Sequence, residues 1–236
     1  MNGDPAIRVA VSGVRGRLGR VAYRALPEAP GIALVGGLAR EADLFDDVFD
    51  SLGPLLERGV DVLLDCTTRP GSVEIALAAV ARGVRPVIGA SGWTDEERTA
   101  LARIAQERGI GAMIVPNFSI GAVMMMQLAE RAARVFPAVE IVETHRREKR
   151  DKPSGTALET ARRLRGAGAE EPAIHSVRLP GAIAHQEVIF GGSGEMLTIR
   201  HDTLSHDSFV PGMLAAIRAV MHVRGLTVGL DGLLRD

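Results

Sequence analysis

A glycine-rich turn lies between the first predicted strand and the first predicted helix. Residues 7–12 (IRVAVS) form an apolar run, and Gly13, Gly16 and Gly19 follow at three-residue intervals. Residues 17–26 then have the spacing of a helix. Glycines at such a turn let the backbone bend sharply and approach a pyrophosphate, and N–H groups at the helix start face that anion. The pattern favours a dinucleotide-binding unit, although three glycines alone also fit a simple turn.

Strands and helices continue to alternate as far as Pro116. The predicted strands span 32–38, 60–65, 86–90 and 110–115, and the predicted helices between them span 71–82 and 94–109. The strand at 60–65 is apolar almost throughout, as expected when both faces are covered. Thr94 and Glu97 have the spacing of a capping box, and Gly109 ends that helix. The alternation predicts an α/β fold with a doubly wound parallel sheet, which is Rossmann-like.

A second kind of pattern follows Pro116. It consists of a Met- and Ala-rich helix at 120–135, a strand at 138–144, a helix at 153–163, short alternating runs within 174–202 and a last helix at 208–223. Hairpin-like turns are predicted at Pro180-Gly181 and at Gly191-Gly192. The runs within 174–202 predict a mixed or antiparallel sheet, and with the helices before them they predict an α+β unit.

The second unit carries a strongly basic segment. Residues 143–157 read ETHRREKRDKPSGTA, in a chain whose formal net charge is −1. The five cationic side chains are Arg146, Arg147, Lys149, Arg150 and Lys152. Ser154 is a natural N-cap, so the N–H groups of Gly155 and Thr156 start a helix and favour an anion. The segment suits a small dicarboxylate. A solvated surface is the alternative, and a nucleic-acid site is disfavoured because no aromatic residue lies in the run.

The rest of the composition indicates a cytoplasmic protein without metal or membrane association. Cys66 is the single cysteine, so no intramolecular disulfide forms, and residues 1–12 have no apolar signal-peptide core. No apolar run reaches the roughly 18 residues of a membrane span. The histidines lack the spacing of metal ligands relative to cysteines or carboxylates.

Five segments together make the chain similar to a known family. They are GVRGRLGR near the start, DCTTRPGS at 65–72, VIGASGW at 87–93, VPNFSIG at 115–121 and ETHRREKRDKPSGTA at 143–157. The last resembles the signature E-x-H-H-x-x-K-x-D-x-P-S-G-T-A and is highly specific. On these motifs, and over nearly its whole length, the chain resembles the 4-hydroxy-tetrahydrodipicolinate reductase (dihydrodipicolinate reductase) family.

The resemblance implies a domain organisation and an activity. Residues 1–116 and 210–236 are expected to form the dinucleotide-binding domain, and 117–209 an inserted substrate-binding and oligomerisation domain. NADH or NADPH is expected to supply hydride for reduction of 4-hydroxy-tetrahydrodipicolinate to tetrahydrodipicolinate, in lysine and diaminopimelate biosynthesis. A homotetramer built through the sheets of the inserted domain is also implied.

The resemblance also assigns individual residues. The expected pyrophosphate contacts are Gly13, Val14, Arg15, Gly16, Arg17 and Leu18. The expected nicotinamide contacts are Gly89, Ala90, Ser91, Val115, Pro116, Asn117 and Phe118. His145 takes the place of the proton donor or acceptor and Lys149 that of the proton donor. Gly155 and Thr156 are expected to bind a substrate carboxylate.

Two departures from the family pattern affect cofactor and substrate. Ala39 stands where the family has an acidic ribose-binding residue, and Arg40 next to it suits a 2′-phosphate, so NADPH is the preferred cofactor and NADH the alternative. Glu41 is one position too late to take that acidic role. Arg146 replaces the second histidine of the signature and can bind a carboxylate bidentately. Two other functions stay open: a paralogous imine or oxo-acid reductase, and a non-catalytic nicotinamide-binding regulator.

Overall fold

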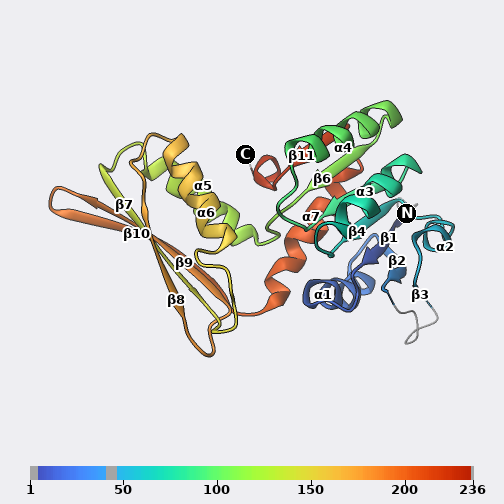
Figure 1. Cartoon of the computed structure of the whole chain (residues 1–236), viewed down its shortest axis with the longest axis horizontal. Coiled ribbons are helices and arrows are strands. Elements are labelled where there is room, and N and C mark those ends of the chain that lie inside the picture. Colours follow the sequence, from blue (N-terminus) through green and yellow to red (C-terminus); the bar gives the residue numbers. More distant parts are fainter. Residues whose placement is uncertain (1–4, 41–46, 235–236) are drawn as a thin grey trace. The chain divides into compact units, whose positions relative to one another are not determined.

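The computed structural model describes residues 5–40 and 47–234, which form two compact units (Figure 1). The first unit comprises Met1–Phe118 and Phe209–Asp236, and the second comprises Ser119–Ser208. The limits expected from the sequence lie at 116/117 and 209/210. The second unit is therefore an insertion between two parts of the first.

A seven-stranded parallel sheet forms the centre of the first unit, in the order β11-β6-β5-β4-β1-β2-β3. Its strands are β1 (Ile7–Ser12), β2 (Ile32–Leu38), β3 (Val48–Phe49), β4 (Val62–Asp65), β5 (Arg85–Ile88), β6 (Gly111–Ile114) and β11 (Gly225–Val228). Its helices are α1 (Arg17–Ala25), α2 (Leu52–Leu56), α3 (Gly71–Ala81), α4 (Asp95–Arg108) and α7 (Val210–Val220), with 3-10 turns η1 (Leu26–Glu28) and η3 (Asp231–Leu233). A third 3-10 turn, η2 (His206–Phe209), adjoins α7.

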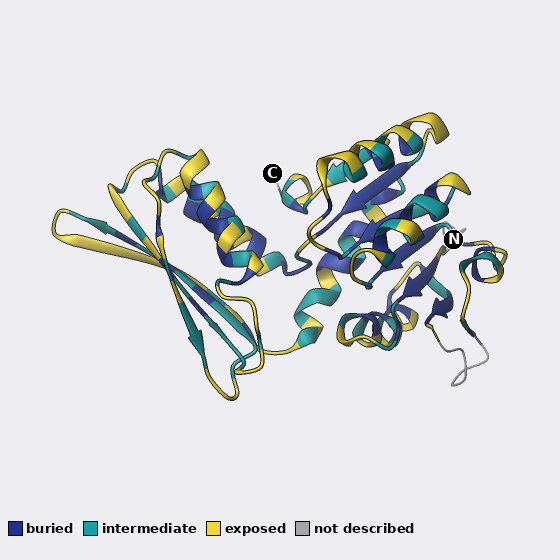
Figure 2. Ribbon diagram, in the orientation of Figure 1, coloured by how far each residue is buried: buried dark blue, intermediate teal, exposed yellow. Residues whose placement is uncertain are grey.

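Helices cover both faces of this sheet. On one face α2, α3 and α4 bury two apolar clusters, centred on Leu63 of β4 and on Ile114 of β6. On the other face α1 and α7 contact each other and the central strands. Every residue of β4 is buried, which confirms the expectation from its continuous apolar run (Figure 2). The capping box at Thr94 and Glu97 is also present, and Gly109 ends α4 in the left-handed conformation.

Three short elements of the first unit were not predicted from the sequence. Strand β3 has two residues, helix α2 has five, and strand β11 has four. Strand β3 and helix α2 contain too few residues to display a helical or strand period. Strand β11 nevertheless completes one edge of the sheet, pairing from Gly225 with Gly111 to Val228 with Ile114. Glu41 lies outside the described residues.

The second unit contains a four-stranded mixed sheet in the order β10-β9-β7-β8. Its strands are β7 (Ala138–His145), β8 (Ala173–Arg178), β9 (Ala184–Gly192) and β10 (Glu195–Thr203), and its helices are α5 (Ile120–Ala132) and α6 (Gly155–Gly166). Strand β7 pairs parallel with β8 and antiparallel with β9. Both helices pack on one face of the sheet, where Ile141, Val188 and Phe190 are fully buried (Figure 2).

The turns of this sheet differ from those predicted. A turn does lie at Pro180-Gly181, but it joins β8 to β9, and these strands flank β7 instead of pairing in a hairpin. The hairpin of β9 and β10 turns at Ser193-Gly194, where Gly194 has a φ of 80°, while Gly191 and Gly192 still belong to β9. A Gly-rich stretch locates the turn to within two or three residues, and the cross-strand pairing sets its register.

No helix among the described residues is both long enough and apolar enough to cross a membrane.

Candidate active site

The glycine turn after β1 has the geometry that a close-approaching ligand requires. Gly13 has a φ of 75°, and a Cβ on it would lie 2.9 Å from the carbonyl oxygen of Cys66. A Cβ on Gly19 would lie 2.1 Å from the carbonyl oxygen of Gly13, so α1 packs directly against the turn. Gly16 is the N-cap of α1, without a side-chain cap, and the first turn has no acidic residue. The helix start is thus electrostatically suited to an anion.

Both predicted nicotinamide-side segments and the end of the predicted pyrophosphate segment meet at Gly89. A Cβ on Gly89 would lie 2.9 Å from Cε2 of Phe118 and 3.4 Å from Cδ2 of Leu18. The residues expected from the sequence to bind a dinucleotide therefore lie together at the carboxyl ends of β1, β5 and β6. In this type of sheet that edge is where ligands bind.

Within this set, side-chain exposure separates residues that can touch a ligand from those that support the site. Val14, Ala90, Val115 and Phe118 are buried in the core of the unit. The exposed or half-buried members are Gly13, Arg15, Gly16, Arg17, Leu18, Gly89, Ser91, Pro116 and Asn117. Arg40 is exposed directly after buried Ala39, at the carboxyl end of β2.

A buried carboxylate that the sequence analysis did not identify organises this edge. Asp65, the last residue of β4, is fully buried and accepts hydrogen bonds from the hydroxyl groups of Ser12, Thr67 and Ser72. The Ser12 bond measures 2.5 Å and the Thr67 bond 2.6 Å. These bonds connect the ends of β1 and β4 to the start of α3. The only sequence signal was an acidic residue ending an apolar strand.

In the second unit, His145 ends β7 and faces a buried carboxylate. Its Nδ1 is hydrogen-bonded to Glu143, whose side chain has no exposed surface. Burial lowers the pKa of His145, and the charges of Lys149 and Arg178 lower it too, so that it stays below its ordinary 6.5 although Glu143 raises it. Burial raises the pKa of Glu143, but its hydrogen bonds outweigh this and hold it below 4.5. At neutral pH the pair is therefore an ionised carboxylate beside a neutral imidazole.

Lys149 lies in the loop that follows β7, and its charge lowers the pKa of His145. Its Nζ bonds Asp151 Oδ2 at 2.7 Å, and its backbone N–H donates to the Arg146 carbonyl oxygen at 3.1 Å. The hydrogen bond from Lys149 lowers the pKa of Asp151. Arg146 itself is half-buried. The loop thus presents cationic groups next to the imidazole.

The same loop leads into the start of α6. Ser154 is its N-cap, as predicted, and its hydroxyl accepts a hydrogen bond from the Ala157 N–H at 3.2 Å. The first turn of α6 contains no acidic residue. Gly155 is exposed, and a Cβ on it would meet no atom within 4 Å, so nothing in the unit itself requires glycine there. Thr156 is half-buried beside it.

The sequence analysis also missed Arg178, at the end of β8. Its guanidinium forms two hydrogen bonds with the Glu143 carboxylate and also bonds main-chain carbonyl oxygens of the 146–151 loop. Arg178 lies far from the motif in sequence, and its only signal was a charged residue in a strand.

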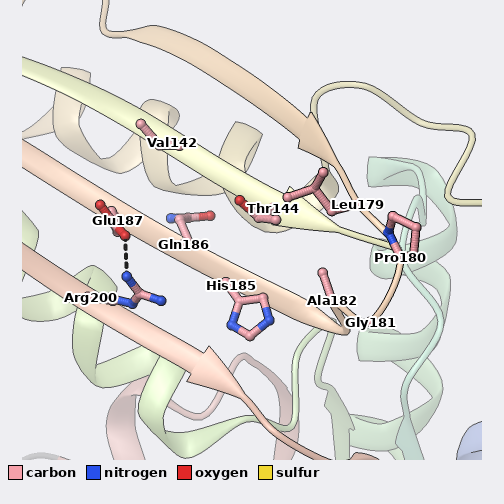
Figure 3. A pocket seen from close by; sticks show the side chains of 10 residues that line it. All are labelled: Val142, Thr144, Leu179, Pro180, Gly181, Ala182, His185, Gln186, Glu187 and Arg200. Atoms are coloured by element: carbon pink, nitrogen blue, oxygen red, sulfur yellow. Dashed lines mark hydrogen bonds and ion pairs between the residues drawn. The ribbon is translucent and has the colours of Figure 1, made fainter. Parts of the chain in front are cut away.

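A pocket of about 300 Å³ lies elsewhere in this unit (Figure 3). Thr144 and His185 contribute to it from β7 and β9, and the ion pair of Glu187 with Arg200 borders it at 2.6 Å. Side chains alternate along a strand, so Thr144 faces the side of the sheet opposite to His145. None of the sequence-predicted site residues lines this pocket. Throughout residues 5–40 and 47–234, no three His, Cys, Asp or Glu side chains are grouped as metal ligands.

Comparison with known families covers nearly the entire chain. The model described as dihydrodipicolinate reductase, N-terminus, matches residues 7–118, and the model for the C-terminus of the same enzyme matches 121–234. The 4-hydroxy-tetrahydrodipicolinate reductase of Moorella thermoacetica is 42% identical over 97% of this chain and 98% of the relative. The 4-hydroxy-tetrahydrodipicolinate reductase of Halalkalibacterium halodurans is also 42% identical, over 97% of this chain and 99% of the relative.

Solved structures give the same result. The dipicolinate-bound dihydrodipicolinate reductase from Paenisporosarcina sp. TG-14 has a TM-score of 0.87 and 36% identity, covering 97% of this chain and 100% of that one. A protein from gentamicin A biosynthesis in complex with NAD shares the fold, with a TM-score of 0.70 and 17% identity over 97% of this chain and 90% of that one. By its sequence, its fold and its match to both family models, this chain belongs to the dihydrodipicolinate reductase family.

Proposed function

We propose that the chain reduces 4-hydroxy-tetrahydrodipicolinate to tetrahydrodipicolinate with NADPH or NADH, in lysine and diaminopimelate biosynthesis. The substrate gains a hydride and a proton and loses its hydroxyl group as water, while the nicotinamide is oxidised. The observation that carries the proposal is the grouping of His145, Lys149 and the open start of α6 on one loop. The membership of the family supplies the substrate.

The glycine turn of the first unit fits a nicotinamide dinucleotide. Any side chain at Gly13 or Gly19 would fill space next to the main chain, and the start of α1 has no acidic residue to repel phosphate. When bound, the dinucleotide supplies the hydride. The main chain of residues 13–18 would hold its pyrophosphate, and half-buried Gly89 and exposed Ser91 would contact the nicotinamide end.

The second unit would bind and protonate the substrate. The N–H groups of Gly155 and Thr156 would donate to one carboxylate, and the guanidinium of Arg146 would pair with a carboxylate. Lys149 carries an ammonium group that can donate a proton as negative charge develops on the substrate. His145 has a lowered pKa, so at neutral pH its imidazole can accept a proton and relay it.

Purified protein with freshly generated 4-hydroxy-tetrahydrodipicolinate tests the activity directly. We expect oxidation of NADPH, followed at 340 nm, that depends on this substrate. Binding of the dinucleotide without oxidation would refute the proposed activity and favour the non-catalytic regulator. Oxidation only with another cyclic imine or an oxo-acid would identify a paralogous reductase, for which Arg146 is the supporting residue.

We also propose a preference for NADPH, on the basis of Arg40. Its side chain is exposed at the carboxyl end of β2, where a 2′-phosphate binds in this type of fold. Ala39 has no carboxylate that would bind a ribose 2′-hydroxyl group instead. Arg40→Ala should raise KM for NADPH and leave KM for NADH nearly unchanged. Arg82→Ala is the matched control, because Arg82 is exposed at the far end of α3. Equal effects of Arg40→Ala on both cofactors would refute this role.

The homotetramer and the cytoplasmic location are further parts of the proposal. On the face of the mixed sheet opposite to α5 and α6, Glu140 and His175 bond at 2.7 Å with more than half of each side chain exposed. Such a face is available to another copy of the chain. Light scattering coupled to gel filtration would measure the assembly, and a monomer at micromolar concentration would contradict it.

A further inference from the structure

Glu143 and Arg178 form an ion pair that is almost completely removed from solvent. Arg178 Nη1 donates to Glu143 Oε2 at 2.9 Å and Nη2 donates to Oε1 at 2.8 Å. The side chains are 0% and 5% exposed. Burying two charges costs desolvation energy, and apolar replacements of such pairs are often as stable. Fold stability alone is therefore a weak explanation for this pair.

Arg178 also fixes the loop that carries Lys149. Its Nη2 donates to the carbonyl oxygen of Asp151 at 2.7 Å, and its Nε donates to the carbonyl oxygen of Lys149 at 3.3 Å. A further bond from Nη1 to the Val177 carbonyl oxygen, at 2.7 Å, holds the guanidinium to its own strand. The main chain at Lys149 is consequently tied to the end of β8. A lysine at position 178 would retain the charge but could not reproduce this planar set of donors.

Glu143 determines which nitrogen of His145 carries the proton. The carboxylate is an acceptor only, and it faces Nδ1 of the imidazole. The neutral imidazole therefore has its proton on Nδ1 and a lone pair on Nε2. A carboxylate behind one ring nitrogen commonly fixes the tautomer and orientation of a histidine in this way.

We propose that Glu143 and Arg178 are a positioning pair: Arg178 holds the main chain of the Lys149 loop, and Glu143 fixes His145 with Nε2 as proton acceptor. The proposal rests on the proposed function, because it concerns how His145 and Lys149 act in that reaction. Neither Glu143 nor Arg178 has to touch the substrate. Both act through the residues that do.

The charges around His145 give the expected direction of a pH effect. Glu143 on β7 and Asp151 in the loop are the anions facing the imidazole, and Lys149 and Arg178 are the cations. Removing the Glu143 charge would leave the cations less opposed and lower the pKa of His145 further. The limb of the kcat/KM profile that reports His145 would move to lower pH.

The tautomer of His145 can be measured without substrate. In a ¹⁵N spectrum of histidine-labelled protein at pH 7.5, the signals that disappear in His145→Gln belong to His145. We expect the Nδ1–H tautomer in the unaltered protein. In Glu143→Gln the amide oxygen is expected to accept from Arg178, which leaves the NH₂ group facing Nδ1 and favours the Nε2–H tautomer. An Nε2–H tautomer or a charged imidazolium in the unaltered protein would overturn the proposal.

Kinetics of folded variants give the second test. Arg178→Lys and Glu143→Gln should lower kcat about 10- to 100-fold, with a smaller change in KM for the dinucleotide, and the His145 limb should shift in Glu143→Gln. Glu159→Gln is the matched control, because Glu159 also bonds two arginines but lies on the surface of α6. Normal kcat and an unshifted profile in both folded variants would overturn the proposal.

If the variants do not fold, the tautomer of the unaltered protein decides. Absence of turnover by the unaltered protein would refute the proposed function, and the spectrum would still report on the pair.

Discussion

Replacing Gly155 by Ala tests whether a carboxylate binds at the start of α6. Gly155 is the first residue of that helix, it is exposed, and its backbone is not in the left-handed region. A Cβ there would meet no atom of the protein within 4 Å. In a helix the Cα–Cβ bond tilts toward the N-terminus, so the methyl group would point toward the end of α6 where a carboxylate is proposed to bind. Stability and ligand binding should therefore respond in opposite directions.

The two magnitudes follow from the geometry. Ala in place of an unstrained Gly stabilises a folded chain by about 0.4–1 kcal/mol, since it restricts the unfolded state. For a chain of this size that corresponds to a rise in Tm of roughly 1–4 °C. A hydrogen bond to a charged group contributes about 1.5–3 kcal/mol, so its loss should weaken carboxylate binding roughly 10- to 150-fold.

Gly166→Ala is the matched control. Gly166 is the last residue of the same helix, it is exposed, and a Cβ there also meets nothing within 4 Å. Thermal unfolding of both variants should show a similar small rise in Tm. Titration calorimetry with dipicolinate and steady-state KM for the substrate should change only in Gly155→Ala. A stable Gly155→Ala variant with unchanged Kd and KM would refute carboxylate binding at Gly155.

Three other predictions follow from the same unit. Lys149→Met should reduce turnover about 100- to 10,000-fold, the range of general acid catalysis, with little change in dinucleotide binding; normal turnover would remove Lys149 from the mechanism. Burial holds the pKa of His201 below 6.5, so the unfolded chain binds its proton more tightly, and the free energy of unfolding should fall as pH decreases through 6.5. Urea unfolding from pH 7.5 to 5 should show a smaller fall in His201→Gln, and an identical fall would contradict this cause. The kcat/KM for an anionic substrate should decrease with added salt, and a salt-independent kcat/KM in the unaltered protein would exclude steering by the exposed cations of the loop. A triple neutral variant should flatten that dependence by changing Arg147, Arg150 and Lys152.

The parallel sheet was predictable because its central strands are buried on both faces. A run such as VDVLLD is apolar almost throughout, and the helix predicted at 94–109 has both a cap at Thr94 and a terminating glycine at Gly109. Strand β11 lacked these signals. Its four residues become a strand only because they pair with β6, and pairing between distant segments is not visible in a local pattern.

The loop of the second unit was predictable for a related reason. Ser154 precedes a helix, and a capping hydroxyl is a local signal that acts over three residues. His145 and Lys149 lie within the same motif, so their proximity needs only one strand end and one short loop. The order of the strands in the mixed sheet could not be predicted from local sequence patterns. Strand β9 returns across β7 to its far side, and the Pro180-Gly181 turn looks the same in sequence whether or not its strands pair.

Arg178 illustrates how a supporting residue escapes sequence reasoning. It is paired with His145 in the register of β8 and β7, which brings its guanidinium to Glu143. That register is fixed by the burial of Ile141 and its neighbours against α6, and a slip by one residue would turn Arg178 to the opposite face. The position of a charged group in the site thus depends on apolar packing further along the strand. A mutation of that apolar face should disturb His145 without touching the motif.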